Sequence, residues 1–266
     1  MWQGGRMWEV PLLALYWFIF GIRRIEKTFI NCYYNISMNQ FSKKPLFGAD
    51  NNALVALVSV SIIVSAVLGF FRVLYFLEGF TYEAYQTEVF QLATLIPQQI
   101  LQHPWTLFTY NWTHTGFWDL FTNMIWLATF CTILQNLGAN KHLFPIYFYS
   151  GFVAGLVYIF IGASVPFLGA QVGVIALAVA ATMLSPKYKF LANAKGGGLP
   201  LWALTLIYFA LATPTLIQQP WQQQVAILLG GLTGLGYIFL LKKQIDLGNW
   251  MHHLLHLLNN SLSPKQ

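Results

Sequence analysis

The sequence has few charged residues. Asp, Glu, Lys and Arg together make up 8% of its 266 residues, whereas about 25% is usual for soluble domains. Hydrophobic residues account for 57%. A soluble protein of this length cannot cover its surface with so few charges, so the composition excludes a water-soluble enzyme, a nucleic-acid-binding module and a disordered chain. It indicates a polytopic membrane protein, for which lipid is the solvent over most of the surface.

Cysteine is scarce too. Cys131 falls in an apolar run and Cys32 in a polar one. Their different surroundings argue against a disulfide. Cysteine usage therefore does not indicate whether the compartment is oxidising or reducing.

Six apolar segments are predicted to cross the membrane as helices. They are residues 53–76, 117–134, 143–162, 168–184, 199–217 and 225–241. The chain therefore divides into an N-terminal cytoplasmic or interfacial extension (1–52), a six-helix membrane domain (53–241) and a cytoplasmic tail (242–266).

The extension contains one further apolar stretch, Val10 to Ile22. Its length covers about 20 Å of a ~30 Å hydrocarbon core, which predicts an interfacial helix or a signal-anchor-like stub. A seventh span is the alternative. Because residues 1–37 differ in character from the rest, Met38 is an alternative start to Met1.

The segment between the first two spans, residues 77–116, is rich in aromatics and contains Pro97 and Pro104. Its apolar part, 90–101, is too short and interrupted to cross. We expect a loop lying in the outer interface, where Trp105, Tyr110 and Trp112 are favourably placed.

Basic residues set the predicted orientation. With six spans, all 14 Lys and Arg residues except Arg72 fall on one side. The opposite loops carry Glu78, Glu83 and Glu88. The positive-inside rule then predicts cytoplasmic termini. Arg72 lies near the outer end of the first span, and snorkelling to that interface explains it.

Apolar residues recur at helical spacing from Gln244 to Leu262. This pattern predicts that the tail forms an amphipathic helix on the cytoplasmic membrane face. His252 and His256 lie one turn apart, as metal ligands can. Since no carboxylate or cysteine joins them, we expect a solvated polar edge. No metal or other cofactor is predicted.

Polar residues within spans are costly and invite functional hypotheses. Asp119 and Asn123 share one face of the second span, and Gln171 lies near the outer end of the fourth. Asp119 either caps its helix or forms a hydrogen-bonded network with Asn123 and Gln171. Small residues permit close helix packing, so the fourth and sixth spans are predicted to touch at Gly173 and at Gly230–Gly231.

Several motifs together resemble rhomboid intramembrane serine proteases of bacterial type. They are Pro104–Tyr110, His114–Phe117 and Phe121–Met124 around the start of the second span, Leu168–Ala170 with the alanine-rich run to Pro186, and Gly230–Gly231 in the sixth. The resemblance covers residues 50–250. It implies an all-α bundle of six transmembrane helices and, for a bacterial member, the inner membrane.

The residues that carry rhomboid chemistry differ. The resemblance implies a Ser–His dyad, but the serine position matches Gln171 and the histidine position matches Leu228, or Ile227 in a shifted register. Of the two oxyanion-stabilising residues, Asp119 replaces a histidine and Asn123 remains. An ionised carboxylate there would repel a developing oxyanion.

The leading hypothesis is a rhomboid-like pseudoprotease that binds transmembrane segments of client proteins without cleaving them. Candidate client-binding residues are Trp112, His114, Asp119, Asn123 and Gln171. The alternatives are an active intramembrane serine endopeptidase, for which Ser164 is a candidate nucleophile, and a structural subunit of a membrane complex. The oligomeric state is left open.

Overall fold

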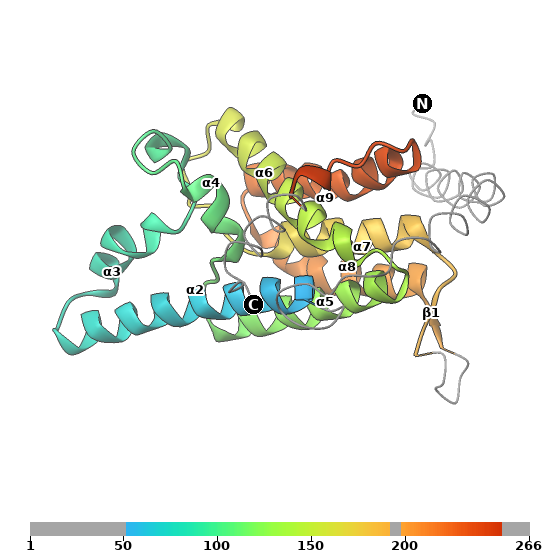
Figure 1. Ribbon diagram of the computed structural model, residues 1–266. Helices are drawn as coiled ribbons and strands as arrows, with labels where there is room; N and C mark the ends of the chain where they lie inside the picture. The colour runs from blue at the N-terminus through green and yellow to red at the C-terminus, as the bar shows by residue number, and fades with distance from the viewer. Residues whose placement is uncertain (1–51, 192–197, 252–266) are drawn as a thin grey trace, which may run out of the picture. The chain divides into compact units, whose positions relative to one another are not determined.

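The computed structural model describes residues 52–191 and 198–251, and these are mostly helical (Figure 1). The N-terminal extension with the segment 10–22, and the histidines at 252 and 256, lie outside the described residues. The longer helices are α2 (Asn52–Leu77), α5 (Phe117–Asn136), α6 (Leu143–Ile161), α7 (Gln171–Leu184), α8 (Leu201–Gln218) and α9 (Trp221–Lys242).

Five apolar helical segments are long enough to cross a membrane. They are 53–77, 117–136, 140–161, 201–218 and 221–242, the third of them including the short helix η4 (Asn140–His142) before α6. The chain is therefore a multi-pass membrane protein. Five of the six predicted spans correspond to these segments.

The fourth predicted span is shorter than the sequence indicated. A helix over residues 168–184 was expected, but α7 begins at Gln171 and has 14 residues, a length of about 21 Å. Gly169 precedes it with φ +112°, a conformation outside the helical region that glycine adopts without steric cost. The backbone before Gln171 therefore cannot continue the helix.

Helix α7 packs against α5, α6, α8 and α9. Its buried residues occupy all of its faces, as the run from Val172 to Ala178 shows. A helix that is apolar all round and enclosed by neighbours belongs to the core. Figure 1 shows α7 among these helices, with α2 alongside α5.

Glycines of α9 bring it close to α7, as predicted. A Cβ on Gly230 would lie 2.6 Å from Val172 Cγ1, and one on Gly231 would overlap Ile175. The prediction for Gly173 was wrong, because that glycine faces the ring of Tyr147 in α6 rather than α9.

Residues 77–116 form short helices and turns rather than a span. These are α3 (Tyr82–Glu88), η1 (Phe90–Leu92), η2 (Pro97–Gln99), α4 (Thr106–Thr109) and η3 (Tyr110–Trp112). Trp105 is 47% exposed, as an interfacial residue would be, but Tyr110 is fully buried. Its hydroxyl donates a hydrogen bond to the Gly151 carbonyl at 2.5 Å, so the placement of Tyr110 at the interface was wrong.

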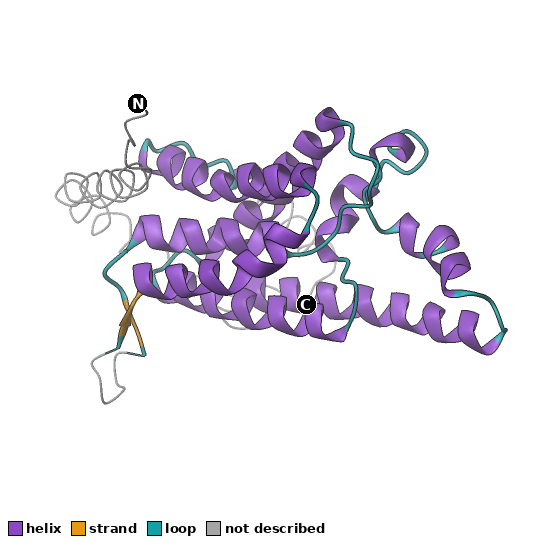
Figure 2. Cartoon of the chain, turned by 180° about the vertical axis from the view of Figure 1, so that it is seen from behind, coloured by secondary structure: helices purple, strands orange, loops and turns teal. Residues whose placement is uncertain are grey.

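A two-stranded hairpin joins α7 to α8. Strand β1 (Lys189–Phe190) pairs antiparallel with β2 (Leu199–Pro200). Both views place this hairpin at the end of the helices away from α3 (Figure 2).

The tail begins with turns rather than with the predicted helix. Residues 244–248 are non-helical, and the positive φ of Gln244 ends α9. Asp246 lies 3.5 Å from Lys141 and 3.8 Å from His142. Burial raises the pKa of Asp246, but the Gly248 N–H and these two side chains outweigh that effect and lower it. The rest of the predicted tail helix falls outside the described residues.

Candidate functional site

The polar residues singled out by the sequence lie at the beginnings of two adjacent helices. His114 precedes α5, whose third residue is Asp119, and Asn123 follows one turn later. Gln171 is the first residue of α7, which packs against α5.

Asp119 is not the N-cap of α5, because Gly116 occupies that position. Its Oδ2 accepts hydrogen bonds from the Thr115 backbone N–H at 3.0 Å and from the Thr115 hydroxyl at 3.1 Å. The carboxylate thus reaches back to satisfy a donor ahead of the helix, as the acidic residue of a capping box does. The prediction that Asp119 is the N-cap residue was therefore wrong, and its carboxylate binds Thr115 from the third position of the helix.

Asn123 is joined to Asp119 but not to Gln171. Its Nδ2 donates to Asp119 Oδ1 at 2.8 Å and to the Asp119 carbonyl at 2.9 Å. Gln171 is half-buried and makes no hydrogen bond to either residue within the described ranges. The three-residue network therefore reduces to the Asp119–Asn123 pair.

His114 is 5% exposed. Its Nδ1 lies 3.1 Å from the Trp112 carbonyl, which can only accept, so Nδ1 carries the proton. Burial lowers the pKa of His114, and the nearby Asp119 carboxylate and the bond to Trp112 oppose that effect without cancelling it. The imidazole is therefore neutral at pH 7, with a bare lone pair on Nε2. That atom has no hydrogen-bond partner in the described part of the chain.

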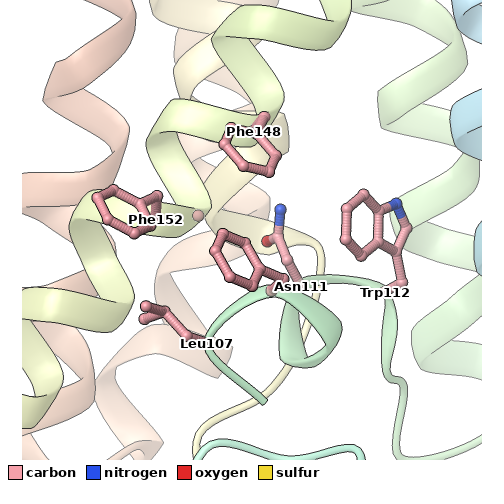
Figure 3. A pocket seen from close by; sticks show the side chains of 7 residues that line it. Leu107, Asn111, Trp112, Phe148 and Phe152 are labelled. Carbon is pink, nitrogen blue, oxygen red and sulfur yellow. The ribbon is translucent and has the colours of Figure 1, made fainter. Parts of the chain in front are cut away.

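Trp112 packs against α6 rather than projecting outward. Its ring centroid lies 5.8 Å from that of Tyr147, whose hydroxyl donates to the Asn111 carbonyl at 2.7 Å. Figure 3 shows Asn111 and Trp112 in a small pocket with Leu107, Phe148 and Phe152. These contacts fix residues 107–112 against α6.

Burial along α9 shows which of the two candidate positions, Ile227 or Leu228, faces α7. Ile227 is 2% exposed, whereas Leu228 is 53% exposed. Gly230 and Gly231, which contact α7, are buried on the same face as Ile227. Of the two registers left open by the sequence, the geometry favours Ile227, and Leu228 points away from α7.

The segment ahead of α7 is fixed by contacts that the sequence did not reveal. Leu95 and Phe167 exchange two backbone hydrogen bonds of 2.9 Å, and the Gly169 N–H donates to the Tyr110 carbonyl at 3.0 Å. Gln223 donates to the Pro166 carbonyl at 2.9 Å. The sequence gives no signal that singles out Gln223, because three glutamines in a row, Gln222 to Gln224, form the first turn of α9.

Gln171 at the start of α7 and Ile227 on the inner face of α9 are not a serine–histidine pair. Residues 143–242 contain no histidine, and a glutamine amide is not a practical nucleophile at neutral pH. Ser164 is exposed, in the turn after α6, with a valine and a proline following it. Among the described residues, no three His, Cys, Asp or Glu side chains gather as a metal site.

The Rhomboid domain matches residues 101–244, which is more than half of the chain. The chain belongs to the rhomboid family. The matched range begins ahead of α4 and ends just after α9, so it includes all the candidate site residues of this rhomboid. No curated protein matched the chain.

Proposed function

We propose that this rhomboid is a pseudoprotease that binds transmembrane segments of other membrane proteins without cleaving them. The observation that carries the proposal is the pair Gln171 and Ile227. These residues occupy the start of α7 and the inner face of α9, where a rhomboid protease would hold its serine and histidine. Neither side chain can attack a carbonyl or accept a proton from a nucleophile.

The electrostatics at Asp119 support the same proposal. Transition-state stabilisation in acyl transfer needs hydrogen-bond donors directed at a developing oxyanion. The Asn123 amide donates both of its bonds within α5 to Asp119. The site therefore offers a carboxylate and an occupied amide where a protease would offer donors.

We place the client between the outer halves of α5 and α8. Trp126 and Phe130 of α5 meet Tyr208 of α8, with ring centroids 5.0 and 5.5 Å apart. The helices continue beyond that contact to Phe117 and to Ile217, which are both 69% exposed. Trp118, Phe121 and Leu211 are exposed on the same halves. The exposed aromatic and aliphatic side chains of α5 and α8 are suited to contact an apolar transmembrane helix of a client protein.

Six crossings are part of the proposal, with α7 as the short fourth. A helix enclosed by protein need not match the full bilayer thickness, because irregular backbone at membrane depth is tolerated where protein buries it. Residues 167–170 directly ahead of α7 are mostly buried, and hydrogen bonds to Leu95, Tyr110 and Gln223 hold the segment 166–169 in place. The one-sided basic residues then favour cytoplasmic termini, in a bacterial inner membrane.

Site-specific photo-crosslinking tests client binding. A photoreactive amino acid at Trp118 should crosslink to a single-span rhomboid-type substrate in lipid vesicles, and the crosslinked substrate should remain full length. The matched control is Phe160, which is 86% exposed at the end of α6 and outside the proposed face. Equal crosslinking at both positions would contradict the proposed face, and a shortened substrate would contradict binding without cleavage.

A further inference from the structure

A cavity of about 360 Å³ lies between α2, α3 and the start of α5. No residue of α7 or α9 lines it. Its apolar wall is formed by Ile62, Ala66, Leu68, Gly69, Phe90, Gly116, Phe117 and Leu120. Its polar wall is formed by Ser65, Arg72, Tyr82, Tyr85, His114 and Thr115. Ligand pockets combine this size with mostly apolar walls and a few polar groups.

Arg72 and Ile62 mark the two ends of the cavity along α2. Arg72 is ten positions beyond Ile62 on α2, a separation of about 15 Å along the helix. Arg72 and Tyr82 form the end near the last turns of α2, while Ile62 and Leu120 lie deeper along the helices. A cation at one end with apolar side chains such as Ile62 and Leu120 beyond it matches a phospholipid, whose charged headgroup sits above its acyl chains. Ser65, His114 and Thr115 add polar groups to the deeper part.

Arg72 is the only Lys or Arg residue between Lys44 and Lys141. Its guanidinium carbon lies 4.9 Å from the ring centroid of Tyr82, and it forms no salt bridge with a described carboxylate. A guanidinium presents a planar fork of donors that matches a phosphate group. This cation is exposed and available to such a ligand.

His114 adds an acceptor to the wall. Its Nδ1 proton is used by the Trp112 carbonyl, and its Nε2 has no partner among the described residues. A hydroxyl group of a ligand could donate to Nε2, with a small movement of the ring. Asp119 lies close enough to act on His114 electrostatically, so a phosphate is favoured at Arg72 rather than at this deeper position.

We propose that this cavity binds one anionic phospholipid, with the phosphate on Arg72 and an acyl chain along Ile62 and Leu120. The rim is continuous with the lipid-facing surface, because Phe117 is 69% exposed and Ile62 48% exposed. The site is independent of whether the protein cleaves or only binds clients.

Native mass spectrometry of the full chain tests the proposal. Protein transferred from vesicles of phosphatidylglycerol and phosphatidylcholine should retain one phosphatidylglycerol through delipidation. Arg72→Gln should weaken retention about tenfold, the loss expected for one charge-assisted contact, and Arg72→Lys should restore part of it. Lys243→Gln is the matched control, because Lys243 is also a helix-end cation over an aromatic ring, 4.6 Å from the centroid of Phe239.

A second variant blocks the cavity while keeping the cation. A Cβ on Gly69 would meet nothing within 4 Å, so Gly69→Leu enters open space and should displace the lipid without disturbing the fold. Unchanged retention in Arg72→Gln or in Gly69→Leu would overturn the proposal. Retention of phosphatidylcholine as strong as that of phosphatidylglycerol would overturn it as well. So would displacement of phosphatidylglycerol by inorganic phosphate at millimolar concentration.

Discussion

Gly234 of α9 lies directly against the backbone carbonyl of Ala176 in α7, at a position where a Cβ would overlap that oxygen. One turn earlier, a Cβ on Gly230 would come within 2.6 Å of Val172 Cγ1 in α7, and within the same distance of Ala154 Cβ in α6. The two helices therefore approach at a distance that only glycine permits. This contact holds the short helix α7 in the centre of the bundle.

The first prediction concerns this contact. Gly234→Ala should destabilise the protein by about 1–3 kcal/mol through overpacking, since backbone atoms of α7 must move to admit the methyl group. Gly236→Ala, on the same helix, is the control, because a Cβ there meets nothing within 4 Å. Thermal unfolding in detergent should show a lower midpoint for Gly234→Ala alone. Equal midpoints for the two variants would mean that α7 and α9 are farther apart.

The second prediction concerns topology. Reporter fusions at Gly79, Pro166 and Pro220 should report the outer side of the membrane, and a fusion at Lys141 should report the cytoplasm. The physical reason is the positive-inside rule acting on the one-sided basic residues. If Pro166 and Lys141 reported the same side, the proposed number of crossings would be wrong. A complete inversion would contradict only the orientation.

The third prediction follows from the buried imidazole of His114. Its pKa in the folded protein is lowered, chiefly by burial, so the unfolded chain takes up a proton first as the pH falls. The contribution of His114 to stability is therefore complete above about pH 6.5, its unfolded pKa, and declines toward the lower folded pKa. His114→Gln should show a smaller fall in unfolding midpoint between pH 7 and pH 5 than the unchanged protein. A parallel fall in both proteins would show that His114 does not titrate on unfolding.

The sequence predicted five of the membrane helices, because long apolar runs determine where such helices form. It predicted the close contact of α9 with α7, since the glycines of α9 are spaced along one helix face. It misplaced the start of α7, because the positive φ at Gly169 depends on contacts with Leu95 and Tyr110 that are distant in sequence.

The candidate site was predicted in part. The pairing of Asp119 with Asn123 follows from helical spacing, and it is present. The choice between Ile227 and Leu228 depended on which face of α9 meets α7, which an apolar helix does not reveal by its own periodicity. The role of Arg72 in a cavity wall also required the tertiary structure, because α3 and the start of α5 complete that wall.

The fourth prediction concerns an attempt to restore the dyad. Gln171→Ser combined with Ile227→His should remain inactive or nearly so against a rhomboid-type substrate. A dyad needs its two atoms within about 2.6–3.2 Å and a receptive oxyanion site, and Asp119 would still oppose the charge. The control combines Gln171→Ser with Leu228→His, whose histidine would point away from α7. Substantial cleavage by the Ile227→His pair alone would show that only two side chains separate this protein from a protease.

The central claim, that this rhomboid lacks a catalytic serine, is tested most directly by serine-reactive labelling. Purified protein in lipid vesicles is incubated with a fluorophosphonate probe, and a parallel sample receives a rhomboid-type transmembrane substrate. We predict no labelling and no cleavage. Labelling at Ser164, together with cleavage that disappears in Ser164→Ala, would contradict the account.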